Sequence, residues 1–274
     1  MMTYNETAER ELTLEEKLEL ALFPVIREKI NRKRKYTGYD LLINGNTEEV
    51  ISTVTSKYEL LRNSDLYGHL KKYEGLHITE VLNFVDRRFF FTFRVDGEPV
   101  TIGNEVLYPT LRVGNSYDRT MGVSFMSGHF RIICNNGAYI GNADKTFYIK
   151  HITKDFQDKV FKAIDTTLAQ SKAIIKVQYE EYIKIEVTEE HVVKVLKKMP
   201  TQYFTDLVAY TDKFGMPPNG WELLNMISYV LTHDANRDKE ATILLENSLT
   251  SYVNDLLGIT NAKFNKMVQD RLES

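Results

Sequence analysis

The stretch RRFFFTFRV, at residues 87–95, decides the fold class of this chain. In a β-strand successive side chains point to opposite faces of the sheet. Phe91 and Phe93 therefore fall on one face of the stretch, whereas Thr92 and Arg94 fall on the other. One face suits a core and the other mixes polar, basic and aromatic groups, so the stretch predicts a strand of an antiparallel sheet.

The segments around this strand show a similar alternating pattern. NEVLYPTLRV, TMGVSFM and HFRIIC are apolar and alternating, and GNSYDR and MSG between them are rich in turn-forming residues. A succession of short strands and turns is typical of an antiparallel meander. We therefore expect a β-rich core from about residue 37 to 150.

The two ends of the chain show helical spacing. Thr13 and Glu16 form a capping box, and the apolar residues that follow recur at helical intervals as far as Ile30, with Pro24 as a kink. Residues 1–36 are thus expected to be an N-terminal helical segment. Residues 151–274 are expected to be a helical subdomain, with helices that start at Thr188 and stop at Gly258. The predicted fold class is α+β: an antiparallel β meander with an N-terminal helix and a C-terminal helical subdomain, packed as one folding unit.

Composition narrows the class of protein. The chain has 274 residues, of which 43% are hydrophobic, and its net charge is −3, so no whole-chain charge attracts a polyanion. A single cysteine excludes an intramolecular disulfide and suits a reducing compartment. Neither a signal peptide nor a run long enough to span a membrane is recognised. We expect a protein of the cytoplasm, in a bacterial host cell, with no membrane partner.

The non-core face of the meander is the first candidate site. If no bulge changes the phase, basic and aromatic side chains gather on this face, where arginines could neutralise phosphates and aromatic rings could stack on bases. The residues are Arg88, Phe90, Arg94, Tyr108, Arg112 and Arg131. The alternative is that the C-terminal helices cover this face and that acids on those helices pair with the arginines.

The second candidate is a basic run near the N-terminus. Its densest part is RKRK, which comprises Arg32, Lys33, Arg34 and Lys35. These charges slightly favour a polyanionic partner, although a solvated helix end whose cations suit the helix dipole is the commoner explanation of such a run. Both candidates point to single-stranded nucleic acid.

Evidence for catalysis or for a cofactor is weaker. Cys134 is the only thiol, but strand alternation places it on an apolar face, which favours a buried structural residue. The histidines lack metal-binding spacing and the glycines lack a phosphate-binding pattern, so no metal, cofactor or catalytic residue is assigned. An enzyme acting on nucleotides or nucleic acid would require Asp118, Cys134, Asn225 and His233 to converge in space.

Several motifs together resemble a known family. VTSKYELLRNSDLY, NSYDRTMGVSFMSGHFRIICNNG and WELLNMISYVLTH occur in this order, and their order and rough spacing are similar to those of the phage/plasmid-like proteins grouped as domain of unknown function 932. The resemblance spans about residues 41–233. The family pattern falls on Tyr58, Asn63, Asn115, Ser116, Asp118, Arg131, Cys134, Asn136, Trp221, Asn225 and His233. In the late motif, NMISYVLTH replaces a more acidic family pattern.

The resemblance implies a mobile-element origin and no settled activity. Our leading hypothesis is a non-enzymatic protein that binds single-stranded DNA as an annealing or recombination accessory and forms a homo-oligomer. A protein that manipulates a host factor, without binding nucleic acid, is the alternative from another class.

Overall fold

The computed structural model describes residues 12–84, 86–96, 99–102, 105–131, 136–140, 148–232 and 239–273. Two antiparallel sheets and a set of helices account for this part of the chain, which confirms the α+β class. A three-stranded sheet has the order β1-β2-β3, and its strands are β1 (Val25–Arg32), β2 (Lys35–Asn44) and β3 (Val50–Thr55).

The larger sheet is the predicted meander. Its path runs β10-β8-β7-β5-β4, with β6 paired to β7 and β9 paired to β8. The strands are β4 (Leu76–Phe84), β5 (Arg88–Val95), β6 (Val100–Ile102), β7 (Glu105–Ser116), β8 (Val123–Arg131), β9 (Asn136–Ile140) and β10 (Tyr148–Ile149). The expected turn at MSG is wrong, because β8 runs without a break through Ser127 and Gly128 and pairs with β7 along this length.

Pro109 lies within β7 and does not disrupt it. Proline has no N–H to donate to a ladder, so it needs a place where no neighbour requires that bond. On one side of β7, β6 pairs only with residues 105–107 and β5 only with residues 110–116. Pro109 falls in the gap between these two partners.

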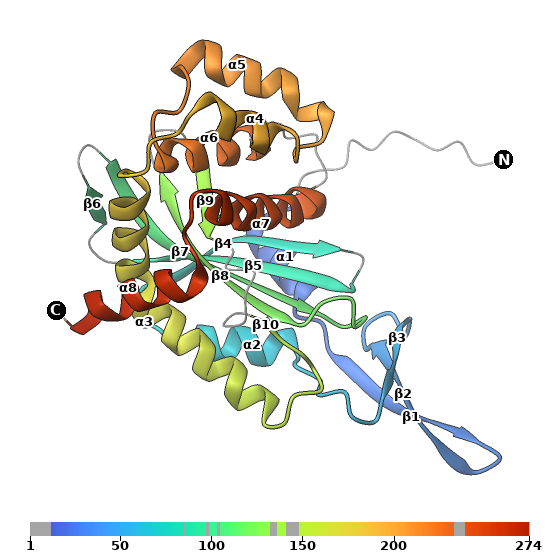
Figure 1. Ribbon diagram of the computed structural model, residues 1–274. Helices are drawn as coiled ribbons and strands as arrows, with labels where there is room; N and C mark the ends of the chain where they lie inside the picture. Colours follow the sequence, from blue (N-terminus) through green and yellow to red (C-terminus); the bar gives the residue numbers. More distant parts are fainter. Residues whose placement is uncertain are drawn as a thin grey trace.

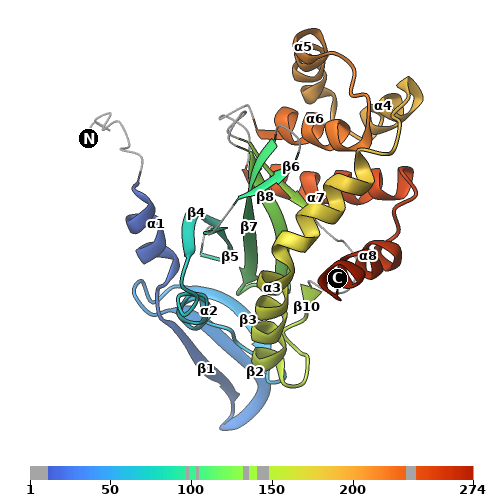
Figure 2. The same ribbon diagram turned by 90° about the vertical axis from the view of Figure 1, so that its left-hand side faces the viewer.

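The helices surround the larger sheet (Figures 1 and 2). Their bounds are α1 (Leu14–Ala21), α2 (Asn63–Leu70), α3 (Phe156–Tyr182), α4 (Glu189–Leu196), α5 (Phe204–Phe214), α6 (Gly220–Thr232), α7 (Lys239–Leu256) and α8 (Asn261–Glu273). One core joins the phenylalanines on the Phe91 face of β5 to α2 and the first half of α3. A second core joins the later half of α3 to α4 through α8.

The N-terminal helix is shorter than expected. The capping box of Thr13 and Glu16 is confirmed, but α1 ends at Ala21, and Pro24 precedes a strand rather than a kink. Residues 25–44 form the hairpin β1–β2, which we call the arm. Figure 1 shows the arm projecting from the body, at the opposite end of the molecule from α4 and α5.

Candidate nucleic-acid interface

The predicted sheet platform is largely covered. Cross-strand pairing puts Phe90 opposite Gly114 and Thr92 opposite Arg112, so these residues do share the face that the alternation indicated. However, Phe90 is only 2% exposed and packs against Met126, and Arg112 is 7% exposed. An aromatic ring buried in this way offers no surface on which a base could stack.

Arg112 is held by internal partners. Its Nε donates to Thr92 Oγ1 at 3.2 Å, and its guanidinium forms ion pairs with Glu80 at 3.4 Å and with Glu246 at 3.8 Å. Glu246 lies on α7 and is itself 4% exposed. The alternative considered from sequence, a covered face with paired arginines, is therefore the correct one at Arg112.

The other members of the platform do not form one surface. Arg94 is exposed, lies 5.9 Å from the centroid of the Tyr108 ring and pairs with Asp96 at 3.4 Å. Arg88 is half-buried at the far end of β5. Arg131 stands opposite Leu107 in the pairing of β7 with β8, but only its backbone is described, so its place beside the other arginines stays a prediction.

Four family-motif residues form a buried polar network. Asn115 Nδ2 donates to Asn63 Oδ1 at 2.9 Å and to the Leu61 carbonyl at 3.0 Å, and Asn63 Nδ2 donates to the Ala21 carbonyl at 2.9 Å. Tyr58 Oη donates to the Ser116 carbonyl at 2.8 Å. These bonds tie the start of α2 and the end of α1 to β7, so the residues stabilise the fold, and none faces an open site.

The remaining motif residues do not assemble an active site within the described part of the chain. Asp118 accepts hydrogen bonds from Thr120 in its own turn, and Trp221 and Asn225 are buried on α6. Cys134 and His233 lie outside the described residues, and only the backbone of Asn136 is described. The convergence that the enzyme hypothesis requires is therefore not seen among the residues that can be placed.

The basic run lies at the end of the arm. Arg32 pairs with Lys35, and Lys33 and Arg34 form the two-residue connection between the strands, with φ of 49° and 63°. Positive φ at both central residues is the requirement of a type I′ turn, the turn that best matches the twist of a hairpin. We call Arg32–Lys35 the tip. All four tip side chains are exposed, and none of them forms an ion pair with an acid in the described part of the chain.

A polar hub fixes the base of the arm. Arg27 pairs with Asp40 at 2.7 Å and donates to the carbonyl of Tyr58 at 2.8 Å, and Tyr36 Oη donates to Asp40 at 2.7 Å. Burial raises the pKa of Asp40, but the hydrogen bonds from Tyr36 and Arg27 outweigh burial and hold that pKa below its ordinary value. The hub was missed from sequence, although Tyr36 directly follows the basic run and Asp40 lies four residues after Tyr36.

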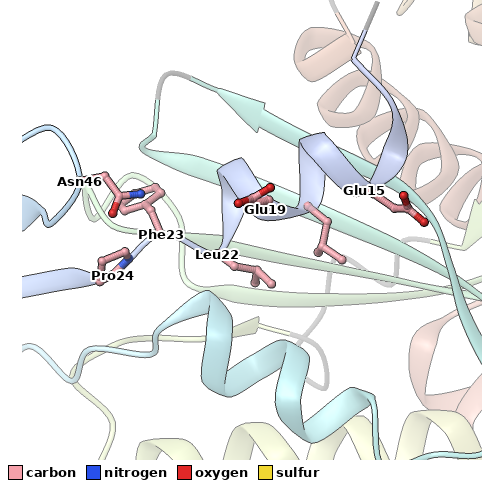
Figure 3. Close-up of a pocket in the computed structure, with 7 residues that line it drawn as sticks. Glu15, Glu19, Leu22, Phe23, Pro24 and Asn46 are labelled. Carbon is pink, nitrogen blue, oxygen red and sulfur yellow. The ribbon is translucent and has the colours of Figure 1, made fainter.

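A shallow pocket lies where α1 meets the arm (Figure 3). Its volume is about 480 Å³, and it is lined by Glu15, Leu18, Glu19, Leu22, Phe23, Pro24 and Asn46. Two carboxylates among mainly apolar groups would repel phosphate, so the pocket does not support a nucleotide site. In the described residues, no group of three or more His, Cys, Asp or Glu could hold a metal ion, and no helix could cross a membrane.

Comparison with known proteins identifies a family. The family model of a domain of unknown function, DUF932, matches residues 50–248, which is more than half of the chain. No curated protein and no solved structure matches. The matched range begins at β3, so the arm lies outside it.

Proposed function

The chain belongs to the DUF932 family, a domain of unknown function, and we propose that it binds nucleic acid through the tip of the arm. The observation that carries the proposal is the concentration of four exposed cations at the end of a projecting hairpin. In a chain of net charge −3, such a cluster must be solvated or neutralised by a partner. Phosphates in a regular row are the partner that fits cations presented on an extended element.

The chemistry of the tip supports this assignment. Arginine binds phosphate oxygens in a bidentate manner, and lysine acts as a mobile point charge. The turn residues add a second argument, because Lys33 and Arg34 occupy positions where Asn-Gly is strongly preferred. Charge at these two positions therefore comes at a conformational cost, which is of the order of 1 kcal/mol per non-glycine residue.

The proposal differs from the sequence-based hypothesis in one respect. The preference for single strands depended on aromatic stacking across the meander, where Phe90 is buried. The proposal therefore depends on the tip, and not on Arg88, Arg112 or Arg131. An annealing or recombination accessory of a phage or another mobile element is the role we propose for this binding, and its support is the resemblance in sequence.

Fluorescence anisotropy with labelled DNA at several salt concentrations tests the proposal. Four neutralised phosphates predict a slope of log K against log salt of about −3.6 for a duplex and about −2.8 for a single strand. Replacement of Arg32, Lys33, Arg34 and Lys35 by Gln should reduce the affinity at least tenfold and flatten the slope. Unchanged affinity in this variant would refute the proposal.

A charge-matched control separates the tip from general electrostatics. Four exposed lysines lie on the body, at the end of α2 and on α3, and their replacement by Gln removes the same charge: Lys71, Lys72, Lys159 and Lys162. The proposal predicts that this control keeps most of the affinity. An equal loss in both variants would indicate net charge alone as the cause and would also contradict the proposal.

A further inference from the structure

The end of the arm is a two-stranded ribbon with solvent on both sides. Of residues 29–37, only Ile30 is half-buried and the others are exposed. With three to four residues per strand at roughly 3.3 Å each, the strands of this ribbon are about 10–13 Å long, and the turn extends them further. The major groove of a B-form duplex is about 12 Å wide and about 8.5 Å deep, and it admits a two-stranded β-ribbon. The ribbon is therefore long enough to reach the floor of such a groove.

The cations lie on both faces of the ribbon. Arg32 and Lys35 are directly opposite each other and so share one face. Tyr36, the next residue along β2, belongs to the other face, and the Lys29 ammonium lies over its ring at 5.6 Å from the centroid. Lys33 and Arg34 occupy the end. Positive charge thus surrounds the ribbon on three sides.

This distribution distinguishes two kinds of nucleic acid. A single strand that lies along one face meets the cations of that face and leaves the others in solvent. A groove presents a row of phosphates on each wall, so a ribbon inside it neutralises phosphates with both faces at once. We infer that the arm enters the major groove of a nucleic-acid duplex, an inference that rests on the proposed function.

Hydrogen bonds at the base of the arm hold it in one orientation, which favours binding. The Arg27 guanidinium bonds to Asp40 and to three backbone carbonyls, those of Thr55, Ser56 and Tyr58. An element held in one orientation loses less entropy on binding than a free loop does. Glu28 is the one exposed carboxylate of the described arm. It faces Leu41, one register position farther from the tip than the Lys29–Asp40 pair, and so lies outside the ribbon that would enter the groove.

The binding test compares a labelled duplex of about 20 base pairs with one of its own strands. We expect the full chain to bind the duplex at least about tenfold more tightly at equal salt. A preference for the single strand would overturn the inference and leave the proposed function intact, whereas no binding of either DNA would overturn both.

Variants on each face test the two-sided contact. Lys29→Gln removes a cation from one face and Arg32→Gln removes one from the other. If the ribbon is inside a groove, each change should weaken duplex binding several-fold and lower the salt slope by about 1. An effect of Arg32→Gln alone would indicate binding by a single face and would contradict the inference.

Competition identifies the groove. Methyl green occupies the major groove and netropsin the minor groove, and either can be added to a preformed complex with the labelled duplex. We expect methyl green to release the protein at concentrations at which netropsin does not. Release by netropsin alone would place the arm in the minor groove and would overturn the inference.

Discussion

At the scale of single residues, Gly114 shows how closely the larger sheet is packed. A Cβ at this position would lie 2.5 Å from Ser124 Oγ and 2.9 Å from Phe90 Cε1. Both distances are far inside van der Waals contact, and Phe90 is buried and cannot move away freely. Only glycine therefore allows the Phe90 ring to lie against β7.

We predict that Gly114→Ala destabilises the protein by about 1–3 kcal/mol, the usual cost of overpacking. In thermal unfolding followed by circular dichroism, this corresponds to a fall in Tm of roughly 2–10 °C. Gly68→Ala is the matched control, because Gly68 lies in α2 and an added Cβ meets nothing within 4 Å. Alanine should be neutral or stabilising there. Equal effects at the two glycines would contradict the packing argument.

His151 should make stability depend on pH. Its ring stacks on Tyr58 at a centroid distance of 4.6 Å, and its Nδ1 lies 2.8 Å from the Glu59 carbonyl, to which it can donate. Burial lowers the pKa of His151, an effect that the bond to Glu59 only partly offsets. Its buried Nε2 has no hydrogen-bond partner among the described residues, so a second proton there would be unsatisfied.

The sign of the effect follows from the direction of this pKa shift. A base with a lowered pKa in the folded state contributes fully above its unfolded pKa of about 6.5, and the contribution is lost as the pH falls below that value. Tm should therefore be lower at pH 5.5 than at pH 7.5. His151→Phe keeps a stacked ring without the titration, so its Tm should be lower at pH 7.5 but should change less over this range. An identical pH dependence in both proteins would contradict the assignment.

At the scale of elements, the ion pair between Arg112 and Glu246 joins α7 to the sheet. Both side chains are buried, so the removal of one charge leaves the other poorly compensated. We predict that Glu246→Gln lowers the free energy of unfolding in urea by about 3 kcal/mol, the low end of the range for a broken buried pair, because Glu80 still faces Arg112.

The double variant Arg112→Met/Glu246→Met provides the control. Replacement of a buried ion pair by apolar side chains of similar volume is often neutral or stabilising. The double variant should thus recover most of the stability that Glu246→Gln loses. If it is less stable than the single variant, the apolar replacement fails and the charge argument is wrong.

The elements also show what a sequence can and cannot predict. Alternation in residues 87–95 correctly assigned Phe91 and Arg94 to opposite faces of β5, because the alternation of a strand depends only on residues that are neighbours in the sequence. Alternation does not say what covers a face: Glu246, far along the chain from Arg112, decides that. The same local reasoning extended the N-terminal helix too far, because Ile26 and Ile30 keep a helical interval although they lie in β1.

For the candidate site too, local features could be predicted from the sequence and contacts between separate strands could not. The tip was identified by its charge, which the local sequence RKRK shows directly, but its conformation was predicted as a helix end. A turn of Lys33 and Arg34 carries none of the glycine or asparagine that indicates a hairpin. The hub of Arg27, Tyr36 and Asp40 could not be predicted, because it depends on the pairing of β1 with β2.

At the scale of the whole molecule, the arm and the body are separable in their contributions to stability. The core that reaches the arm includes Val25 and Leu42, at its base, and no buried apolar residue between them. Since stability comes mainly from buried apolar surface, the outer part of the arm contributes little to the folding of the body. The arm is therefore expected to serve binding rather than folding.

We predict that a shortened arm leaves the body intact. In this variant, Asn-Gly replaces residues 30–39, so that Lys29 and Asp40, which already face each other, close a two-residue turn. Tm should stay within about 3 °C of the original value, because no core residue is removed. Binding of duplex DNA should fall to the level of the variant that lacks the four tip charges. A shortened chain that folds as before and binds as before would place the nucleic-acid contact on the body, whereas a large fall in Tm would show that the arm supports the fold.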